Sequence, residues 1–246
     1  FCCCNSYYKE LAKLWVDVFT HTNQNIAYKI FCLDRDSFAF LKQHGIIVEL
    51  YEVDNADQFN ENLCLARYKI AHKLLHSYDS VIYSDLDAFH VRDISILLSL
   101  CKGNDMLISV ADHDNSHPRR IFEQWKFVLC TGWMYFNNSC VNILCQFINN
   151  FYEIDESADP GDQLKFNYYI DERTQSMLHT PGEWIRTQIK IKENNARLFL
   201  NIGCISTSII NRHSADDCYV YHPVGGGKQC DKKIELVSPA LTAAMV

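Results

Sequence analysis

The chain has 246 residues, 48% of them hydrophobic and 22% charged, which is the balance of a globular protein long enough to bury a substantial core. Its 23 basic and 30 acidic side chains give a net charge of −7, which argues against a protein built to hold nucleic-acid backbone. Nine glycines and five prolines exclude collagen-like and low-complexity architectures, and no apolar run approaches the roughly 18 residues of a membrane-spanning helix.

Short β-rich runs alternate with longer amphipathic stretches through the first 150 residues. The predicted elements, a strand first and then helix and strand in turn, are Phe1–Cys4, Tyr7–Phe19, Ala27–Leu33, Asp36–Gln43, Ile46–Tyr51, Asn60–Ser77 and Ser80–Ser84. The alternation continues through Ile94–Leu100, Met106–Val110, Phe127–Phe136 and Cys140–Phe151. Strands separated by helices of this length predict an α/β fold, with a mostly parallel sheet covered by helices on both faces.

The alternation of strand and helix patterns becomes less regular after about residue 155. A polar loop over Asp155–Asp162 precedes a predicted helix over Gln163–Ile170, and a glycine-rich tail follows at His222–Lys228. The chain shows no internal repeat and no linker, so a single domain is predicted. It begins with Phe1 and carries no targeting segment, and we expect its natural start, with any membrane anchor before it, to be missing from this sequence.

The strongest chemical signal is an acidic pair that directly follows the predicted strand Ser80–Ser84. Asp85 and Asp87 flank one residue near the carboxyl edge of the sheet, where open α/β sheets bind ligands. On extended chain these two carboxylates point to the same side, and they repel unless a cation lies between them. The alternative is a polar strand end with solvated aspartates.

Further motifs are individually weaker. His222 can complete the ligand shell of a Mn²⁺-type ion, and the glycines from Gly225 with Lys228 suit a phosphate group, although a flexible tail gives the same pattern. Asp162 before Gln163 is also an ordinary helix cap. The remaining candidates are Arg67 and Lys69, which otherwise form a solvated helix face, and Tyr8, which can stack on a base or pack in the core.

The order of these motifs along the chain, with Thr131-Gly132 between the acidic pair and Asp162-Gln163, resembles the nucleotide-diphospho-sugar transferase family of the glycosyltransferase family 77 type. It is also similar to the glycogenin-like family 8 enzymes. The resemblance extends from Asn5 to Lys228 and implies a Rossmann-like GT-A fold spanning residues 1–246 as one domain. It implies a nucleotide-binding half over about 1–110 and an acceptor and catalytic half over about 111–246.

The resemblance also implies a role for each matching position. It implies binding of the nucleotide-sugar by Tyr8, Arg67, Lys69, Asp85, Thr131, Gly132, Gly225 and Lys228, metal ligation by Asp85, Asp87 and His222, and catalysis by Asp162 and Gln163. The implied activity is metal-dependent, retaining transfer of a sugar from a nucleotide-diphosphate donor to a glycan or glycoprotein acceptor. Mn²⁺ or Mg²⁺ is the implied metal, and UDP is favoured over GDP because of the position of Tyr8.

Two alternatives stay open at this point. One is a catalytically silent relative that binds a nucleotide-sugar, and the other is a phosphatase of the haloacid-dehalogenase type with Asp85 as nucleophile. Similar eukaryotic enzymes act in the Golgi lumen, which we expect here. The twelve cysteines, many within apolar runs, suit a reducing cytoplasm equally well.

Overall fold

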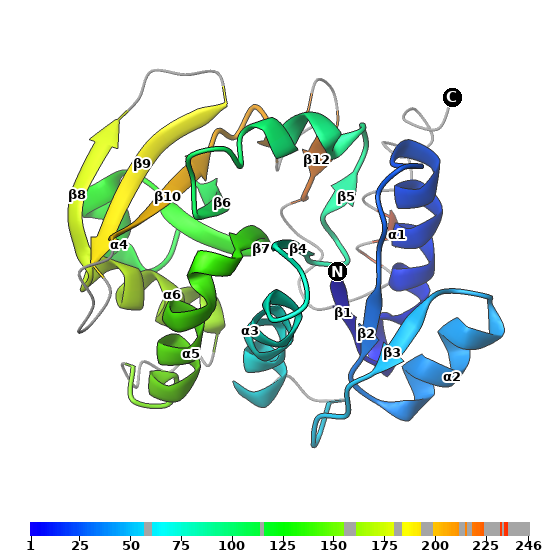
Figure 1. Cartoon of the computed structure of the whole chain (residues 1–246). Helices are drawn as coiled ribbons and strands as arrows, with labels where there is room; N and C mark the ends of the chain where they lie inside the picture. Colours follow the sequence, from blue (N-terminus) through cyan, green and yellow to red (C-terminus); the bar gives the residue numbers. More distant parts are fainter. Residues whose placement is uncertain are drawn as a thin grey trace. The chain divides into compact units, whose positions relative to one another are not determined.

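The computed structural model describes residues 1–56, 61–113, 116–154, 161–179, 184–192, 199–211, 215, 218–223, 232 and 234–235. Contacts divide the chain into two compact units (Figure 1). The first unit comprises Phe1–Leu63, Ser84–Ser99 and Ser208–Val246, and the second comprises Cys64–Tyr83 and Leu100–Thr207. Each unit therefore combines segments that are far apart in the sequence. The expected functional division at about residue 110 stays a prediction.

The first unit contains two small sheets. Strands β1 (Cys2–Cys4), β2 (Ile30–Cys32) and β3 (Val48–Leu50) form a parallel sheet in that order, connected through η1 (Ser6–Tyr8), α1 (Lys9–Thr22) and α2 (Arg35–Gln43). The second sheet has the order β11 (Ile210–Asn211), β12 (Val220–Tyr221), β5 (Phe89–His90), and η2 (Ile94–Ser99) follows β5 along the chain. Parallel strands joined by helices are what the alternating sequence pattern predicts.

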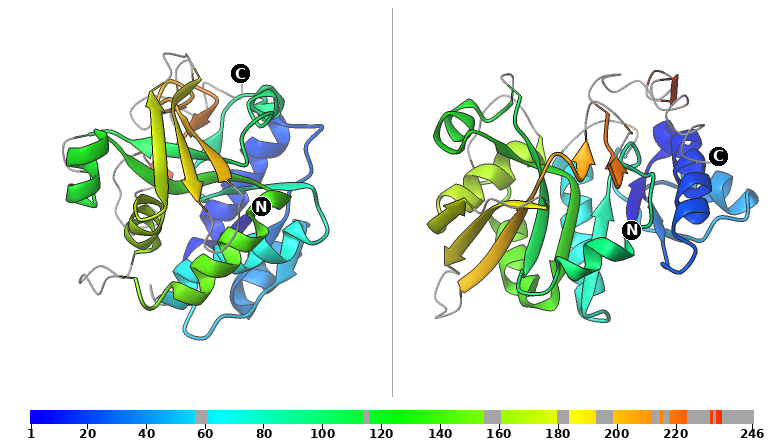
Figure 2. Two further views of the ribbon diagram at one scale, coloured as in Figure 1. Left: turned by 60° about the vertical axis from the view of Figure 1, so that its left-hand side comes forward. Right: turned by 90° about the horizontal axis from the view of Figure 1, so that it is seen from above.

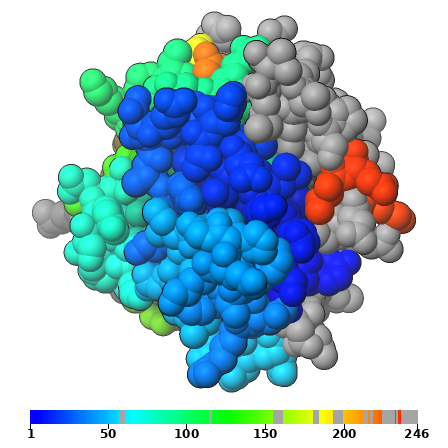
Figure 3. Space-filling view, turned by 90° about the vertical axis from the view of Figure 1, so that its right-hand side faces the viewer, coloured from blue at the N-terminus to red at the C-terminus, as the bar shows by residue number. Residues whose placement is uncertain are grey.

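Both helices of this unit form for local reasons. In α1 the buried side chains recur at helical spacing, and the ring of Trp15 stacks on Phe19 with centroids 4.7 Å apart. In α2 the side chain of Asp34 caps the first turn by accepting a hydrogen bond from the Ser37 amide at 2.7 Å. Gly45, with φ of 73°, adopts the left-handed conformation just beyond the end of α2. The segments around α1 and α2 lie side by side on one face of the unit (Figure 3).

The second unit is built on a six-stranded sheet with the order β4-β7-β6-β10-β9-β8. Its elements are α3 (Glu61–Leu75), β4 (Ser80–Ser84), β6 (Met106–Ala111), α4 (Arg119–Trp125), β7 (Val128–Asn137), η3 (Asn138–Cys140), α5 (Val141–Asn150), α6 (Asp162–Asp171), β8 (Thr174–His179), β9 (Ile185–Lys192) and β10 (Phe199–Ile205). All six residues of β6 and nine of the ten in β7 are buried, so these two strands form the centre of the core. Helices α4 and α6 pack against β7.

The α/β class is confirmed, but the expectation of a mostly parallel sheet is wrong for this unit. Strand β10 runs parallel to β6, whereas the pairs β6–β7, β9–β10 and β8–β9 are antiparallel. Strand β8 ends at His179 and β9 begins at Ile185, and β9 ends at Lys192 and β10 begins at Phe199 (Figure 2). Connections this short join antiparallel strands, because a parallel crossover needs about a dozen residues or more. The sequence signal for β9 is the alternation of Ile185, Thr187, Ile189 and Ile191.

None of the helices in the described part of the chain is long and apolar enough to cross a membrane. All cysteines in that part have free thiols, including Cys204 and Cys218.

Candidate active site

The acidic pair lies in a tight turn that follows β4, within the first unit. The Ala88 amide donates a hydrogen bond to the Asp85 carbonyl at 3.0 Å, so the pair is held in a turn rather than on the extended chain that the sequence predicts. The Ser84 amide, just before the turn, donates to the Phe1 carbonyl at 3.0 Å and thus ties the end of β4 to the start of the chain. Asp87 is buried, with 8% exposed, and Asp85 is half-buried.

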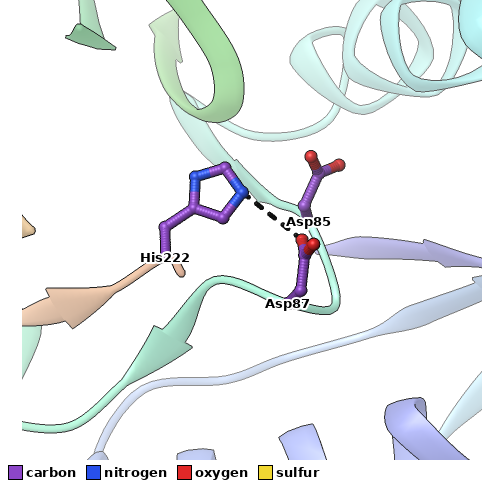
Figure 4. Close-up of side chains that lie close together, drawn as sticks. All are labelled: Asp85, Asp87 and His222. Carbon is purple, nitrogen blue, oxygen red and sulfur yellow. Dashed lines mark ion pairs between the residues drawn. The ribbon is translucent and has the colours of Figure 1, made fainter. Parts of the chain in front are cut away.

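His222 reaches this turn because of strand pairing. Strand β12 pairs antiparallel with β5, with Tyr221 opposite Phe89, so the next position places His222 across from Ala88 and adjacent to Asp87. The His222 amide donates to the Asn211 carbonyl at 2.8 Å, which fixes the backbone at the end of β12. The imidazole Nε2 lies 3.4 Å from Asp87 Oδ1 (Figure 4).

Asp85, Asp87 and His222 together have the geometry of a metal-binding group. One ligand atom from each of the three side chains lies within 4.8 Å of the other two, and no other set of three such residues gathers this closely among the described residues. Two carboxylates and an imidazole are a donor set that suits Mn²⁺ and related divalent ions. The structure thus brings together the three residues that the sequence predicts as metal ligands.

A buried network supports the turn from below. The Ala88 carbonyl accepts hydrogen bonds from the Trp15 indole at 2.9 Å and from the Ser84 hydroxyl at 3.1 Å. His90 Nε2 lies 3.1 Å from Ser84 Oγ, and burial lowers the pKa of His90 to about 3, so its ring is neutral at physiological pH. Sequence reasoning missed Trp15, Ser84 and His90, because an apolar helix position and strand residues carry no signal of such a contact.

A second group of polar residues gathers around Asp162, within the second unit. Asp162 is 5% exposed, and its Oδ2 accepts a hydrogen bond from the Tyr68 hydroxyl at 2.8 Å. Arg67 Nε lies 3.6 Å from the same oxygen, and the guanidinium also donates to the Thr131 carbonyl at 3.3 Å and lies over the Tyr83 ring. Burial, and then the charge of Asp162, raise the pKa of the Tyr68 hydroxyl well above its usual value. The structure therefore brings together three predicted site residues, Arg67, Thr131 and Asp162, and adds Tyr68.

Helix α6 is fixed on β7 at the level of this group. Asn167, which is fully buried, accepts a hydrogen bond from the Leu129 amide and donates one to the Leu129 carbonyl, both at 2.8 Å. Gly161 is the N-cap and Asp162 the first helical residue, one position later than a capping role for Asp162 requires. The Gln163 side chain donates to the His117 carbonyl at 3.4 Å and is half-buried.

Thr131 and Gly132 lie in an interruption of the β6–β7 ladder. Ser109 pairs with Cys130 whereas the preceding Ile108 pairs with Met134, so three residues of β7 bulge from the sheet. The Ser109 hydroxyl spans the bulge by donating to the Cys130 carbonyl at 2.8 Å, with the Trp133 carbonyl at 3.3 Å. The bulge therefore places the Thr131 backbone carbonyl beside the Arg67 guanidinium.

The other predicted site residues have less defined surroundings. Tyr8 ends η1 at the carboxyl end of β1 and is half-buried, with its ring 5.0 Å from that of Tyr7. Lys69 is exposed on α3. Gly225 and Lys228 lie outside the described residues.

Comparison with known proteins identifies the family. The nucleotide-diphospho-sugar transferase family matches residues 27–223, well over half of the chain, so the chain belongs to this family of glycosyltransferases. The match does not favour the phosphatase interpretation, and the finer assignment to the family 77 or family 8 type stays a prediction. A search among curated proteins found no significant match.

Solved glycosyltransferases share the fold. A glycosyltransferase involved in the glycosylation of the major capsid of PBCV-1 is 11% identical with a TM-score of 0.53, and the match covers 95% of this chain and 98% of that one. GlyE from Streptococcus pneumoniae TIGR4 is 16% identical with a TM-score of 0.50, over 68% of this chain and 41% of GlyE. The bifunctional glycosyltransferase WbbM is 18% identical with a TM-score of 0.47, over 68% of this chain and 36% of WbbM. The matched part is thus less than half of GlyE and of WbbM, and the likeness to GlyE and to the PBCV-1 capsid glycosyltransferase concerns the fold alone.

Proposed function

We propose that this chain transfers a sugar from a nucleotide-diphosphate donor, most favourably a UDP-sugar, to a hydroxyl of a glycan or glycoprotein acceptor with retention of anomeric configuration. The observation that carries the proposal is the convergence of Asp85, Asp87 and His222 at the carboxyl end of β4. Membership in the nucleotide-diphospho-sugar transferase family supports the class of donor.

The donor set fits a divalent cation such as Mn²⁺ or Mg²⁺. Asp85, Asp87 and His222 would hold it, and when bound it would neutralise negative charge that develops on the leaving diphosphate. The backbone of the Asp85–Ala88 turn is anchored before any ligand arrives, because the Trp15 and Ser84 side chains both donate to the Ala88 carbonyl. Lys228 stays a predicted additional cation for the diphosphate.

The nucleotide base has a suitable polar atom in the first unit. Asn5, at the end of β1, donates through Nδ2 to the Ala56 carbonyl, while its buried Oδ1 has no hydrogen-bond partner among the described residues. The Asn5 Oδ1 can accept a hydrogen bond from an N–H group of a nucleobase, and the side chain of Tyr8, three residues later, can stack on the ring of that base. Both features support a nucleobase at this edge, and we favour uracil.

Asp162 is the carboxylate proposed to face the reacting sugar. The bond between the anomeric carbon and the diphosphate oxygen breaks with its electron pair staying on the phosphate, and the acceptor oxygen forms its bond on the same face. The acceptor proton passes to the leaving phosphate. Asp162 stabilises positive charge on the sugar ring, and the Gln163 amide lies one residue further along α6.

Calorimetric titration tests this proposal. UDP and then GDP are titrated into the protein with Mn²⁺ and again with EDTA, and we expect UDP binding that requires Mn²⁺ and is lost in Asp87→Ala. Asp17→Ala, an exposed aspartate on α1, is the matched control and keeps binding. Turnover of a UDP-sugar then separates an enzyme from a silent relative that only binds. Absence of binding by either nucleotide in both conditions would overturn the site.

A further inference from the structure

We propose that Tyr68 is a positioning residue for the reaction, which holds one carboxylate oxygen of Asp162 and leaves the other for the substrate. The inference rests on the proposed function, since it assigns to Tyr68 the orientation of a carboxylate that acts on the sugar. It follows from one contact: the Tyr68 hydroxyl donates to Asp162 Oδ2 at 2.8 Å, and no described residue forms a hydrogen bond with Oδ1.

The Tyr68 ring has little freedom to move. Its side chain is fully buried, with its ring centroid 4.7 Å from that of Phe147 and 5.6 Å from that of Phe166, on which it stacks. Packing of this kind fixes the position of the hydroxyl, because rotation of the ring would require the neighbouring aromatic rings to move as well. The hydroxyl is therefore a fixed point against which the carboxylate is oriented.

Tyr68 can only donate in this contact. A buried phenol beside a carboxylate keeps its proton across the physiological range, as the raised pKa of Tyr68 indicates. A carboxylate accepts hydrogen bonds, so the Tyr68 proton points at Oδ2 in every turnover.

Arg67 cannot perform the same task alone. Its guanidinium is shared among Asp162, the Thr131 carbonyl and the face of the Tyr83 ring, and its Nε lies 3.6 Å from Oδ2, beyond hydrogen-bond distance. Arg67 therefore stabilises the negative charge of Asp162, whereas the hydrogen bond from Tyr68 orients its carboxylate. Helix α6, which carries Asp162, is held on β7 by the hydrogen bonds between Asn167 and Leu129. The hydrogen bond from Tyr68 therefore restricts the rotation of the Asp162 side chain rather than the position of the helix.

Tyr68→Phe is the direct test, because it removes the hydroxyl and keeps the ring. UDP-glucose, UDP-galactose, UDP-N-acetylglucosamine and UDP-xylose are screened for hydrolysis and transfer, and the donor with the highest turnover is used. We expect kcat to fall by about tenfold or more, the size of one hydrogen bond to a charged group, with the KM for the donor changed less than twofold.

Tyr169→Phe is the matched control. Tyr169 is equally buried, its ring also lies against Phe147 at 5.1 Å, and its hydroxyl donates to the Ile143 carbonyl at 3.3 Å. This variant loses a buried hydroxyl from the same aromatic cluster without touching Asp162. We expect it to keep both the kcat and the donor KM of the wild type.

Asp162→Asn distinguishes failure of the positioning role of Tyr68 from failure of the proposed function. If Asp162→Asn abolishes turnover while Tyr68→Phe behaves like Tyr169→Phe, the positioning role is wrong and the proposed function stands. If Asp162→Asn keeps wild-type turnover, the catalytic role of Asp162 is wrong and the positioning role of Tyr68 fails with it, while the transfer activity stands. If the wild type turns over no sugar nucleotide, the proposed function itself fails.

Discussion

The Nε2 atom of His222 lies 3.4 Å from Oδ1 of Asp87, although the two residues are 222 − 87 = 135 positions apart in the chain. The contact is a consequence of the β5–β12 pairing, in which Tyr221 lies opposite Phe89. One side of the site thus comes from the turn after β4 and the other from the end of β12. A metal bound there would join two segments of the first unit that are connected by only a short ladder.

The first prediction concerns the imidazole ligand. His222→Ala should weaken Mn²⁺ binding in the presence of UDP by at least tenfold. Loss of a ligand should cost at least as much affinity as mutation of a residue that hydrogen-bonds to a ligand, which costs about 10–100-fold. Calorimetry with Mn²⁺ as titrant measures the change. His21→Ala, an exposed histidine in the last turn of α1, is the control and should leave the affinity unchanged. Equal affinities in wild type and His222→Ala would remove His222 from the site.

The second prediction concerns the indole beneath the turn. Trp15→Phe removes the hydrogen bond to the Ala88 carbonyl, and we expect it to lower the free energy of unfolding by about 1–3 kcal/mol and the Mn²⁺ affinity several-fold. Phe19→Leu weakens the same cluster, since Phe19 stacks on Trp15, but it leaves the turn contact in place. The control should lose stability and keep its Mn²⁺ affinity. The same affinity in both variants would show that Trp15 does not position the turn.

The metal-binding residues could be predicted from the sequence, whereas the residues that support the site could not. Asp85 and Asp87 were recognisable because two carboxylates one residue apart at the end of an apolar strand suit a cation, and the motif order supported both this pair and His222. Trp15 and Tyr68 were not, since each lies at an apolar helix position where a core residue is the natural interpretation. The Trp15 indole bonds to Ala88, which is 73 residues away in the sequence, and the Tyr68 hydroxyl bonds to Asp162, which is 94 residues away. Only the tertiary fold creates these two contacts.

The strands of the sheet in the second unit were also predicted only in part. Strand β4 was predicted with its observed bounds, because a short apolar run ends there at a polar cluster. Strands β8, β9 and β10 were all missed. Strand β8 is mostly exposed, carries no alternating apolar face and lies at the edge of the sheet. The antiparallel pairing followed from the few residues that separate these strands along the chain, which the alternation of helices and strands in the first 150 residues does not predict.

The third prediction is a pH dependence of stability that arises from His90. Its pKa is lowered to about 3 in the folded protein, mainly by burial, against an ordinary value of 6.5. Below pH 6.5 the unfolded chain binds a proton that the folded protein does not, so stability falls by about 1.4 kcal/mol for each pH unit between 6.5 and 3. At and above pH 7.5 the contribution is fully present.

Urea unfolding at pH 7.5 and 5.5 measures this effect. His90→Phe keeps an aromatic ring against Trp15 and Phe19 but cannot titrate, so its stability should fall less between the two pH values than that of the wild type. The expected difference is about 1.4 kcal/mol. His21→Ala should follow the wild type. Parallel losses in wild type and His90→Phe would show that His90 is protonated in the folded protein.

The fourth prediction concerns the junction between α6 and β7. Asn167→Leu removes both hydrogen bonds to Leu129 and leaves a buried amide and a buried carbonyl without partners, so we expect a loss of about 2–5 kcal/mol in the free energy of unfolding. Asn167→Asp keeps the acceptor for the Leu129 amide and loses only the donor. Its loss should be smaller than that of Asn167→Leu if two hydrogen bonds, rather than shape, hold the helix. Denaturant unfolding of the two variants decides this, and a larger loss in Asn167→Asp would show that burying a second charge near Asp162 outweighs the retained hydrogen bond.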